Sequence, residues 1–173
     1  MDSGKLLREI LDRNEYYLLP GFDGLTDAEL RQPVAAGANP IGWLMWHVAR
    51  VQDRAVAGMT DQEQLWIRDG WYARFGREAD PEDRGNGDTS EHVAAFAAPS
   101  AALLLAYYTA VRAVVNGFLD TLDTDDPERP VPGFGGAMVP LASRTGGLLI
   151  EALQHTGQIA YARGVIQGEG WMG

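Results

Sequence analysis

Apolar positions recur every three to four residues in four long stretches of the chain, and this period predicts amphipathic helices. The first helix is expected to begin at Asp2 or Ser3 and to stop at Pro20-Gly21. The second follows Asn39-Pro40, where asparagine is a favoured N-cap and proline suits the first helical position, and it runs towards Gly58. Each stretch has one apolar face, so both are expected to pack on a common core.

The two remaining long helices lie in the second half of the chain. Pro99-Ser100 caps the third, whose wide apolar stripe extends to Leu122. The fourth is expected to begin near Ser143 or Thr145 and to stop at Gly168, because glycine adopts the left-handed conformation that ends many helices. The third helix is apolar enough to be a core helix.

Shorter elements are predicted between the long helices. The segments 26–29 and 60–63 both have the spacing of a capping box, with a threonine three residues before a glutamate. Residues 65–75 are aromatic without a long period, which indicates short helical turns. Residues 76–90 are rich in glycine and charge and form an unusually long loop. This loop is interpreted either as a functional lid or as a mobile, solvated connection.

Four long amphipathic helices joined by connections of very unequal length predict an all-α four-helix bundle in which at least one connection crosses the bundle. Residues 123–140 contain several prolines and glycines and are expected to be irregular, with room for an extended crossover. No alternating strand pattern stands out. The length of 173 residues fits one domain, 1–173, with a sizeable core.

The charge and the cysteine count narrow the classes of function. With 24 acidic against 14 basic residues and a net charge of −10, the chain has no basic cluster for nucleic acid. Cysteine is absent, so any metal site must use histidine, aspartate or glutamate. The N-terminus lacks an apolar signal core, and no run approaches the roughly 18 apolar residues of a membrane span. We therefore expect a soluble cytoplasmic protein.

One pair of residues in the fourth helix has the spacing of metal ligands. Glu151 and His155 are four residues apart and therefore share a helix face about one turn apart. His47 lies in the second long helix, in the apolar segment 43–50, and is the natural third ligand because facing helices of a bundle can build a site in its core. The alternative is a hydrogen-bonded core histidine and an ordinary helix pair. His92 has no partner at ligand spacing and is expected on the surface.

Two motifs carry a resemblance to a known family. The segment 155–164, HTGQIAYARG, and the segment 39–50, NPIGWLMWHVAR, resemble the DinB/YfiT superfamily of metalloenzymes. The segment 66–71, WIRDGW, resembles an actinobacterial branch of mycothiol-transferase-like proteins. The resemblance implies a four-helix bundle, a metal site often occupied by zinc or nickel, and homodimers in many members. His47 and His155 match two of the three histidine ligands of that family.

The chain departs from the family at Glu151, which stands where the commonest pattern has a histidine. Glutamate is also a zinc ligand, and one carboxylate with two neutral imidazoles gives a divalent site a net charge of about +1. Within the resembling motif, Gln158 and Arg163 are candidate residues for cofactor binding. Helix packing is the other interpretation for Gln158, and an interaction with the helix macrodipole is the other for Arg163.

The function that the resemblance implies is a metal-dependent thiol S-transferase, joining a low-molecular-weight thiol such as mycothiol to an electrophilic small molecule in a detoxification or stress response. The absence of cysteine agrees with a thiol supplied by a co-substrate. Two alternatives stay open. One is a metal-dependent hydrolase or isomerase, and the other is a non-enzymatic binding protein of the same fold that sequesters a small molecule or metal.

Overall fold

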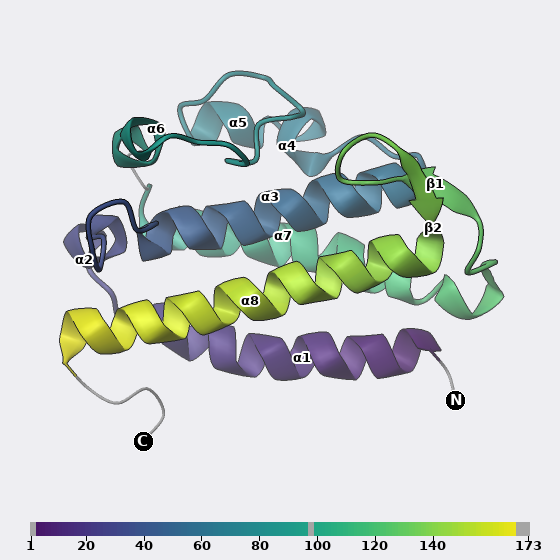
Figure 1. The fold of residues 1–173 in the computed structure, drawn as a ribbon, viewed down its shortest axis with the longest axis horizontal. Helices are drawn as coiled ribbons and strands as arrows, with labels where there is room; N and C mark the ends of the chain where they lie inside the picture. Colours follow the sequence, from purple (N-terminus) through teal and green to yellow (C-terminus); the bar gives the residue numbers. More distant parts are fainter. Residues whose placement is uncertain (1–2, 97–98, 169–173) are drawn as a thin grey trace.

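The structure is a computed structural model that describes residues 3–96 and 99–168. The four predicted long helices are α1 (Ser3–Phe22), α3 (Ile41–Thr60), α7 (Ala101–Leu119) and α8 (Leu141–Gln167). They form a four-helix bundle, and the fold is all-α, as predicted (Figure 1). Helix α3 packs against α7 and α8, and α1 packs against the other sides of the same two helices. Large apolar side chains from all four helices fill the space between them.

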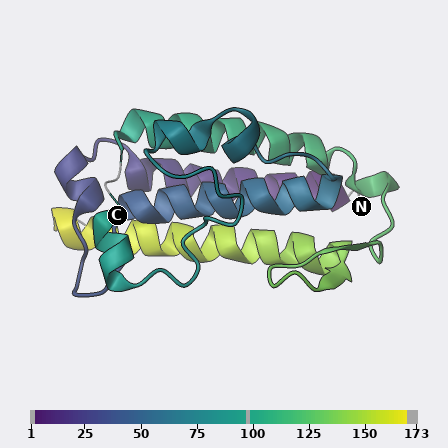
Figure 2. The same ribbon diagram turned by 90° about the horizontal axis from the view of Figure 1, so that it is seen from above.

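The direction of the helices explains the long connection. Helices α3 and α7 run parallel to each other, and α1 and α8 run in the opposite direction (Figures 1 and 2). Since α3 and α7 are parallel neighbours, the chain must return along the length of the bundle between them. Residues 61–100 make this return and carry α4 (Leu65–Arg68), α5 (Trp71–Arg74) and α6 (Ser90–Ala95). The connection that crosses the bundle is therefore the one between α3 and α7. Residues 123–140, where an extended crossover was expected, instead join α7 to α8 at one end of the bundle (Figure 1).

The remaining elements are short. Helix α2 (Asp27–Arg31) has the predicted capping box, because Thr26 and Glu29 exchange side-chain to backbone hydrogen bonds. The 3₁₀ helix η1 (Leu122–Thr124) follows α7. Strands β1 (Pro130–Pro132) and β2 (Met138–Pro140) form an antiparallel hairpin with Val131 opposite Val139. These strands were not predicted, because each is only three residues long and begins or ends with proline.

Several predicted helix limits are wrong by a few residues. Helix α1 passes Pro20 and ends at Phe22, where Arg163 of α8 donates to the carbonyls of Pro20 and Asp23 and supports the last turn. The alternative N-cap Asp2 lies outside the described residues, and Ser3 is the first residue of α1. Helix α3 begins one residue late, since Pro40 is its N-cap rather than its first residue, and α8 begins early, at Leu141.

The capping box predicted for residues 60–63 does not form. Thr60 donates to the carbonyl of Val56 within α3, and α4 begins only at Leu65. The buried carboxylate of Asp53 accepts the backbone N–H groups of Leu65 and Trp66, each at 2.8 Å. A tertiary contact from α3 thus replaces the local cap, because a carboxylate satisfies the free N–H groups of a first helical turn as well as a neighbouring threonine does.

Helix α7 has an apolar composition that the sequence analysis underestimated. Its 19 residues are long and apolar enough, by length and hydropathy alone, to span a membrane. In the bundle, 44% of that stretch is buried, and the helix contributes core residues such as Tyr107 and Val111. The composition of α7 is therefore accounted for by its place in the core.

Candidate metal centre

His47 lies in the middle of α3 with only 4% of its surface exposed. Its ring stacks on that of Trp43, with centroids 4.8 Å apart and planes 9° apart. Nδ1 is hydrogen-bonded to the main-chain carbonyl of Arg84, which lies in the loop over α3. A carbonyl only accepts, so Nδ1 must carry the proton, and Nε2 of a neutral ring then presents its lone pair. That lone pair faces α8.

The predicted partners lie on the facing side of α8. One carboxylate oxygen of Glu151 is 3.1 Å from His155 Nε2 and 3.7 Å from His47 Nε2. The two imidazole rings meet edge to face, with centroids 4.7 Å apart. One ligand atom from each of the three residues lies within 4.8 Å of the others. The structure therefore brings together the three residues that the sequence analysis singled out.

Gln158 fixes the orientation of His155. Its side-chain oxygen lies 2.7 Å from His155 Nδ1 and accepts a hydrogen bond from it. As with His47, the outer nitrogen is then a donor and the inner Nε2 is free to act as a ligand. Hydrogen bonds of this kind orient the histidines of metal sites and set their tautomer. Gln158 is thus in position to support the cluster through His155.

The three facing atoms are His47 Nε2, His155 Nε2 and a carboxylate oxygen of Glu151. None of them is a hydrogen-bond donor while both imidazoles are neutral. Two Nε2 lone pairs and a carboxylate oxygen converge, and each of them is an acceptor. A proton on His155 or a shared cation is needed to make this arrangement favourable. In a tetrahedral site with bonds of about 2.1 Å, ligand atoms are about 3.4 Å apart. The separations of 3.1 and 3.7 Å from Glu151 bracket this value, so the donor set fits a divalent ion.

Burial also favours the neutral form of the His47 ring, which is the form that binds a metal ion. Removal from water lowers the pKa of His47, and the nearby His155 lowers it further, against opposing effects of the Arg84 carbonyl and Glu151. The ring is therefore neutral near pH 7, as metal coordination requires. The side chains of Glu151 and His155 are partly exposed, at 31% and 15%. The cluster thus has a buried side on α3 and an accessible side on α8.

The loop predicted at residues 76–90 forms one wall of the site. It runs over α3 towards α8 (Figure 2) and is held by side chains of α3. Arg50 donates to the carbonyls of Asp83 and Pro81, and Trp43 donates to Asp88 at 3.2 Å. These bonds place the Arg84 carbonyl beside His47. The loop is therefore held against α3 beside the site, and its role as a functional lid stays a prediction.

Arg163 lies elsewhere. Its guanidinium donates to main-chain carbonyls at the end of α1, two turns beyond His155 along α8. Arg163 thus joins α8 to the end of α1, and its predicted role in cofactor binding stays a prediction. His92 lies in α6 with a largely exposed side chain, as predicted.

Two residues near the site were missed by sequence reasoning. Arg84 acts through its main-chain carbonyl, and any residue type supplies that group, so its identity carries no signal. Asp53 is a carboxylate at a buried position of an apolar helix, where it accepts from Tyr107 at 2.8 Å and pairs with Arg50 at 3.3 Å. An acidic residue within an apolar face was a signal that something must satisfy it.

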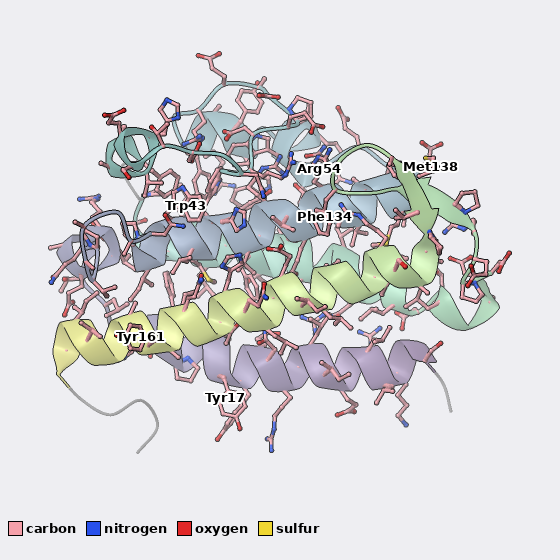
Figure 3. The ribbon with its side chains drawn as sticks, viewed as in Figure 1. Tyr17, Trp43, Arg54, Phe134, Met138 and Tyr161 are labelled. Carbon is pink, nitrogen blue, oxygen red and sulfur yellow. The ribbon has the colours of Figure 1, made fainter. Side chains whose placement is uncertain are left out.

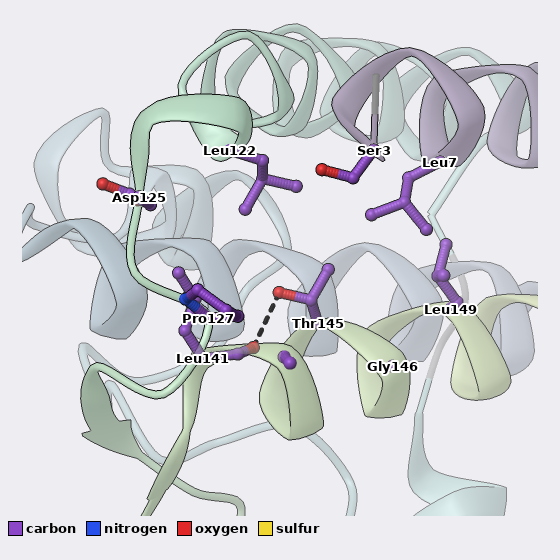
Figure 4. Close-up of a pocket in the computed structure, with 10 residues that line it drawn as sticks. Ser3, Leu7, Leu122, Asp125, Pro127, Leu141, Thr145, Gly146 and Leu149 are labelled. Carbon is purple, nitrogen blue, oxygen red and sulfur yellow. Dashed lines mark hydrogen bonds between the residues drawn. The ribbon is translucent and has the colours of Figure 1, made fainter. Parts of the chain in front are cut away.

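A cavity lies away from the cluster of His47, Glu151 and His155. It has a volume of about 590 Å³ and opens between α1, η1 with the segment after it, and the start of α8 (Figure 4). Its lining is mainly apolar and includes Leu7, Leu122 and Leu149, with Thr145 bonded to the carbonyl of Leu141. None of the three cluster residues lines it. The cluster and this cavity therefore lie on different sides of α8.

A four-helix bundle with imidazole and carboxylate groups converging from two of its helices defines a class of candidate metalloproteins. Residues 10–159 match the model of the DinB superfamily, and the chain belongs to that superfamily. A solved structure described as the conserved protein of locus from Enterococcus faecalis is similar over 98% of this chain and 99% of that chain, with 24% identity and a TM-score of 0.86. This likeness shows the fold. A comparison with curated proteins found no match.

Proposed function

We propose that the protein is a metal-dependent thiol S-transferase, which conjugates a low-molecular-weight thiol such as mycothiol to an electrophilic small molecule. The observation that carries the proposal is the convergence of His47 Nε2, His155 Nε2 and a Glu151 oxygen with no donor among them. Such a cluster, on a site with one accessible side, suits a divalent ion that keeps a position open for a ligand. Zinc or nickel is the proposed metal.

Each residue has a role that follows from its contacts. His47, Glu151 and His155 would hold the ion, and the Arg84 carbonyl and Gln158 would keep the two imidazoles in the tautomer that binds it. When bound, the ion supplies a positive charge that keeps a coordinated thiol as thiolate near neutral pH. The carboxylate of Glu151 moderates that charge to about +1. Trp43 packs against His47 and keeps water from the buried side.

The proposed reaction needs no nucleophile from the protein, and the chain has no cysteine. The sulfur of the co-substrate forms a bond to an electrophilic carbon, and the bond from that carbon to its leaving group breaks. The thiol proton goes to solvent. Removal of reactive electrophiles by a reduced thiol suits a detoxification or stress response in the cytoplasm, and that location and role are part of the proposal.

The test is consumption of an activated aryl halide or an epoxide by the zinc-loaded or nickel-loaded protein, with and without mycothiol. We expect conjugate formation only when the thiol is present, and a loss of at least about a hundredfold in the His155→Ala variant, because one ligand and its charge are removed. Product formed without thiol would identify a hydrolase or isomerase instead. Ligand binding without turnover, unchanged in His47→Ala, would identify a non-enzymatic binding protein.

A further inference from the structure

Each of the two helices that carry the cluster also carries an arginine seven residues towards the hairpin end of the bundle. On α3, Arg54 follows His47, and on the antiparallel α8, Arg144 precedes Glu151. Seven residues make nearly two helical turns, so each arginine lies on the same face as the ligand of its helix, about 10 Å along the axis. The interface between α3 and α8 therefore has a candidate metal centre and, two turns away, a pair of arginines.

Arg144 is a buried cation that lacks hydrogen-bond partners. It is 3% exposed, and its Nε and Nη1 atoms are buried without an acceptor among the described residues. The ring of Phe134, from the loop between β1 and β2, covers the guanidinium with 3.6 Å from its carbon to the ring centroid. Gly147 permits this close approach, since a Cβ there would lie 2.9 Å from the ring.

The surroundings of Arg144 carry an excess of positive charge, although the chain as a whole has a net charge of −10. Arg54 and Arg84 both pair with the single carboxylate of Glu82, at 2.7 and 3.2 Å. Arg84 also reaches the Phe134 carbonyl at 3.5 Å, and its Nε is buried without a partner. Burial and the charges of Arg54 and Arg84 lower the pKa of Arg144 to about 10. Glu151 has the opposite effect and raises the pKa of Arg144. With Glu82 and Glu151 set against these three arginines, one more negative charge would balance the group.

Arg50 provides an internal comparison. It is fully buried on α3, and its guanidinium donates to Asp83, Asp53, Tyr107, Gln64 and Pro81. The fold thus satisfies a structural arginine completely when it buries one. A guanidinium left with unused donors is costly unless an anion binds there. The difference between Arg50 and Arg144 indicates that the partner of Arg144 is not among the residues that the structure describes.

We propose that Arg144, with Arg84, binds a carboxylate of the substrate, so that the thiol or the electrophile handled by the enzyme is an acid. This inference rests on the proposed function for its second anchor, the metal centre. The substrate would place its sulfur or electrophilic carbon at His47, Glu151 and His155 and its carboxylate at Arg144, two turns along α8. The planar guanidinium suits a carboxylate because it donates two parallel hydrogen bonds.

The test uses ω-mercapto carboxylic acids, from mercaptoacetate to mercaptooctanoate, and the ω-mercapto alcohols of the same lengths. Their binding to the cobalt-loaded protein is followed by the sulfur-to-cobalt charge-transfer band. We expect one chain length of acid to bind about ten- to a hundredfold more tightly than its alcohol, as for a buried charge-assisted hydrogen bond. Arg144→Met should abolish that preference and leave alcohol binding unchanged. Arg68→Gln, an exposed arginine paired with Asp69, is the control and should retain the preference.

A second measurement separates this inference from the proposed function. Adipate, a dicarboxylate, should raise the melting temperature of the metal-free protein but not that of the Arg144→Met variant. If cobalt binds and the acids show no advantage over the alcohols, the carboxylate site is wrong while the metal centre stands. If no cobalt binds but adipate stabilises only proteins that keep Arg144, the proposed function fails and the carboxylate site stands.

The stability of the variants shows whether Arg144 is instead structural. An unpartnered buried cation replaced by methionine should leave the melting temperature unchanged or higher. A large loss of stability in Arg144→Met would overturn the inference. Arg144→Lys keeps the charge without the two parallel donors, and we expect it to fold and to lose most of the preference for the acid. Full preference in the lysine variant would also contradict bidentate binding.

Discussion

At the scale of single residues, the site depends on how two imidazoles are oriented. The identity of His47, Glu151 and His155 and their places on helices were predictable, because a histidine within an apolar face and an i,i+4 pair are visible in the sequence. The tautomer of His47 was not predictable, since it depends on the carbonyl of Arg84, 37 residues away along the chain. Every residue type carries the same main-chain carbonyl, so the sequence cannot show which carbonyl contacts His47.

The lowered pKa of His47 predicts how the metal-free protein responds to acid. The unfolded chain binds a proton at His47 near pH 6.5, while the buried ring in the folded protein binds it only at lower pH. Below that pH the unfolded state holds more protons, so stability must fall as the pH is lowered through about 6.5. Each unit of lowering in the pKa corresponds to about 1.4 kcal/mol. Urea unfolding of the EDTA-treated protein from pH 8 to about pH 5 measures this loss.

Glu151 and His155 face His47, so the comparison requires a variant that removes the imidazole of His47 alone. His47→Gln keeps a side chain that can bond to the Arg84 carbonyl but cannot be protonated. We expect a shallower loss of stability below about pH 6.5 in this variant. An identical pH dependence in the two proteins would show that His47 is not a neutral buried group.

At the scale of elements, the sequence predicted the long helices well and their limits less well. The spacing of apolar residues identifies the face that a helix buries, and that face extends over many residues. Helix ends were misplaced where a distant side chain replaced a local signal. Arg163 supports the end of α1 beyond Pro20, and Asp53 of α3 caps α4 in place of Thr60. Such contacts form only after the helices have packed.

The loop over α3 is the element on which the orientation of His47 depends, and Gly85 fixes its path. Gly85 has φ +82°, and a Cβ there would lie 2.3 Å from the ring of Trp43. Gly85→Ala should therefore displace the adjacent Arg84 carbonyl from His47 and weaken metal binding by about tenfold or more, with the helices intact. Zinc affinity by competition with a chromogenic chelator, together with circular dichroism, measures both effects.

Gly87 offers a matched control for this substitution. It also has a positive φ, of +86°, but a Cβ there would meet nothing within 4 Å. Gly87→Ala introduces similar backbone strain without the contact with Trp43, so metal affinity should stay within about twofold of the wild type. Equal losses in the two variants would mean that strain in the loop, and not the position of the Arg84 carbonyl, determines the affinity.

At the scale of the whole molecule, unequal loop lengths correctly predicted a crossover in a four-helix bundle. The hairpin of β1 and β2 was not predictable, because strands of three residues are too short to show an alternation of apolar and polar residues. Its loop nevertheless supplies Phe134, which covers Arg144. The sequence thus predicted the scaffold and the metal cluster, while the surroundings of the cluster came from segments whose positions only the tertiary structure determines.

One face of α8 predicts self-association, as expected from the homodimers that the family resemblance implies. Four exposed apolar side chains lie along it: Ile150, Leu153, Tyr161 and Val165. Exposed tyrosines also occur on α1, and Figure 3 shows Tyr17 and Tyr161 pointing away from the bundle. Contiguous apolar surface of this kind is typical of protein interfaces. We expect a dimer by sedimentation equilibrium and a monomer for Tyr161→Glu.

Leu105 provides the control for this prediction, because it is an exposed apolar residue on α7 rather than α8. Leu105→Glu should remain dimeric. A monomeric wild-type protein would contradict the predicted dimer. A dimer that persists in Tyr161→Glu and dissociates in Leu105→Glu would show that the interface lies on α7 and not on α8.

The central claim is that one divalent ion binds between α3 and α8, and anomalous diffraction from a zinc-loaded crystal tests it most directly. We predict a single strong anomalous peak within about 2.2 Å of His47 Nε2, His155 Nε2 and a carboxylate oxygen of Glu151. We also predict that Nδ1 of each histidine keeps its bond to the Arg84 carbonyl or to Gln158. A crystal soaked at saturating zinc with no peak between these three residues, or with the peak elsewhere on the chain, would contradict the account.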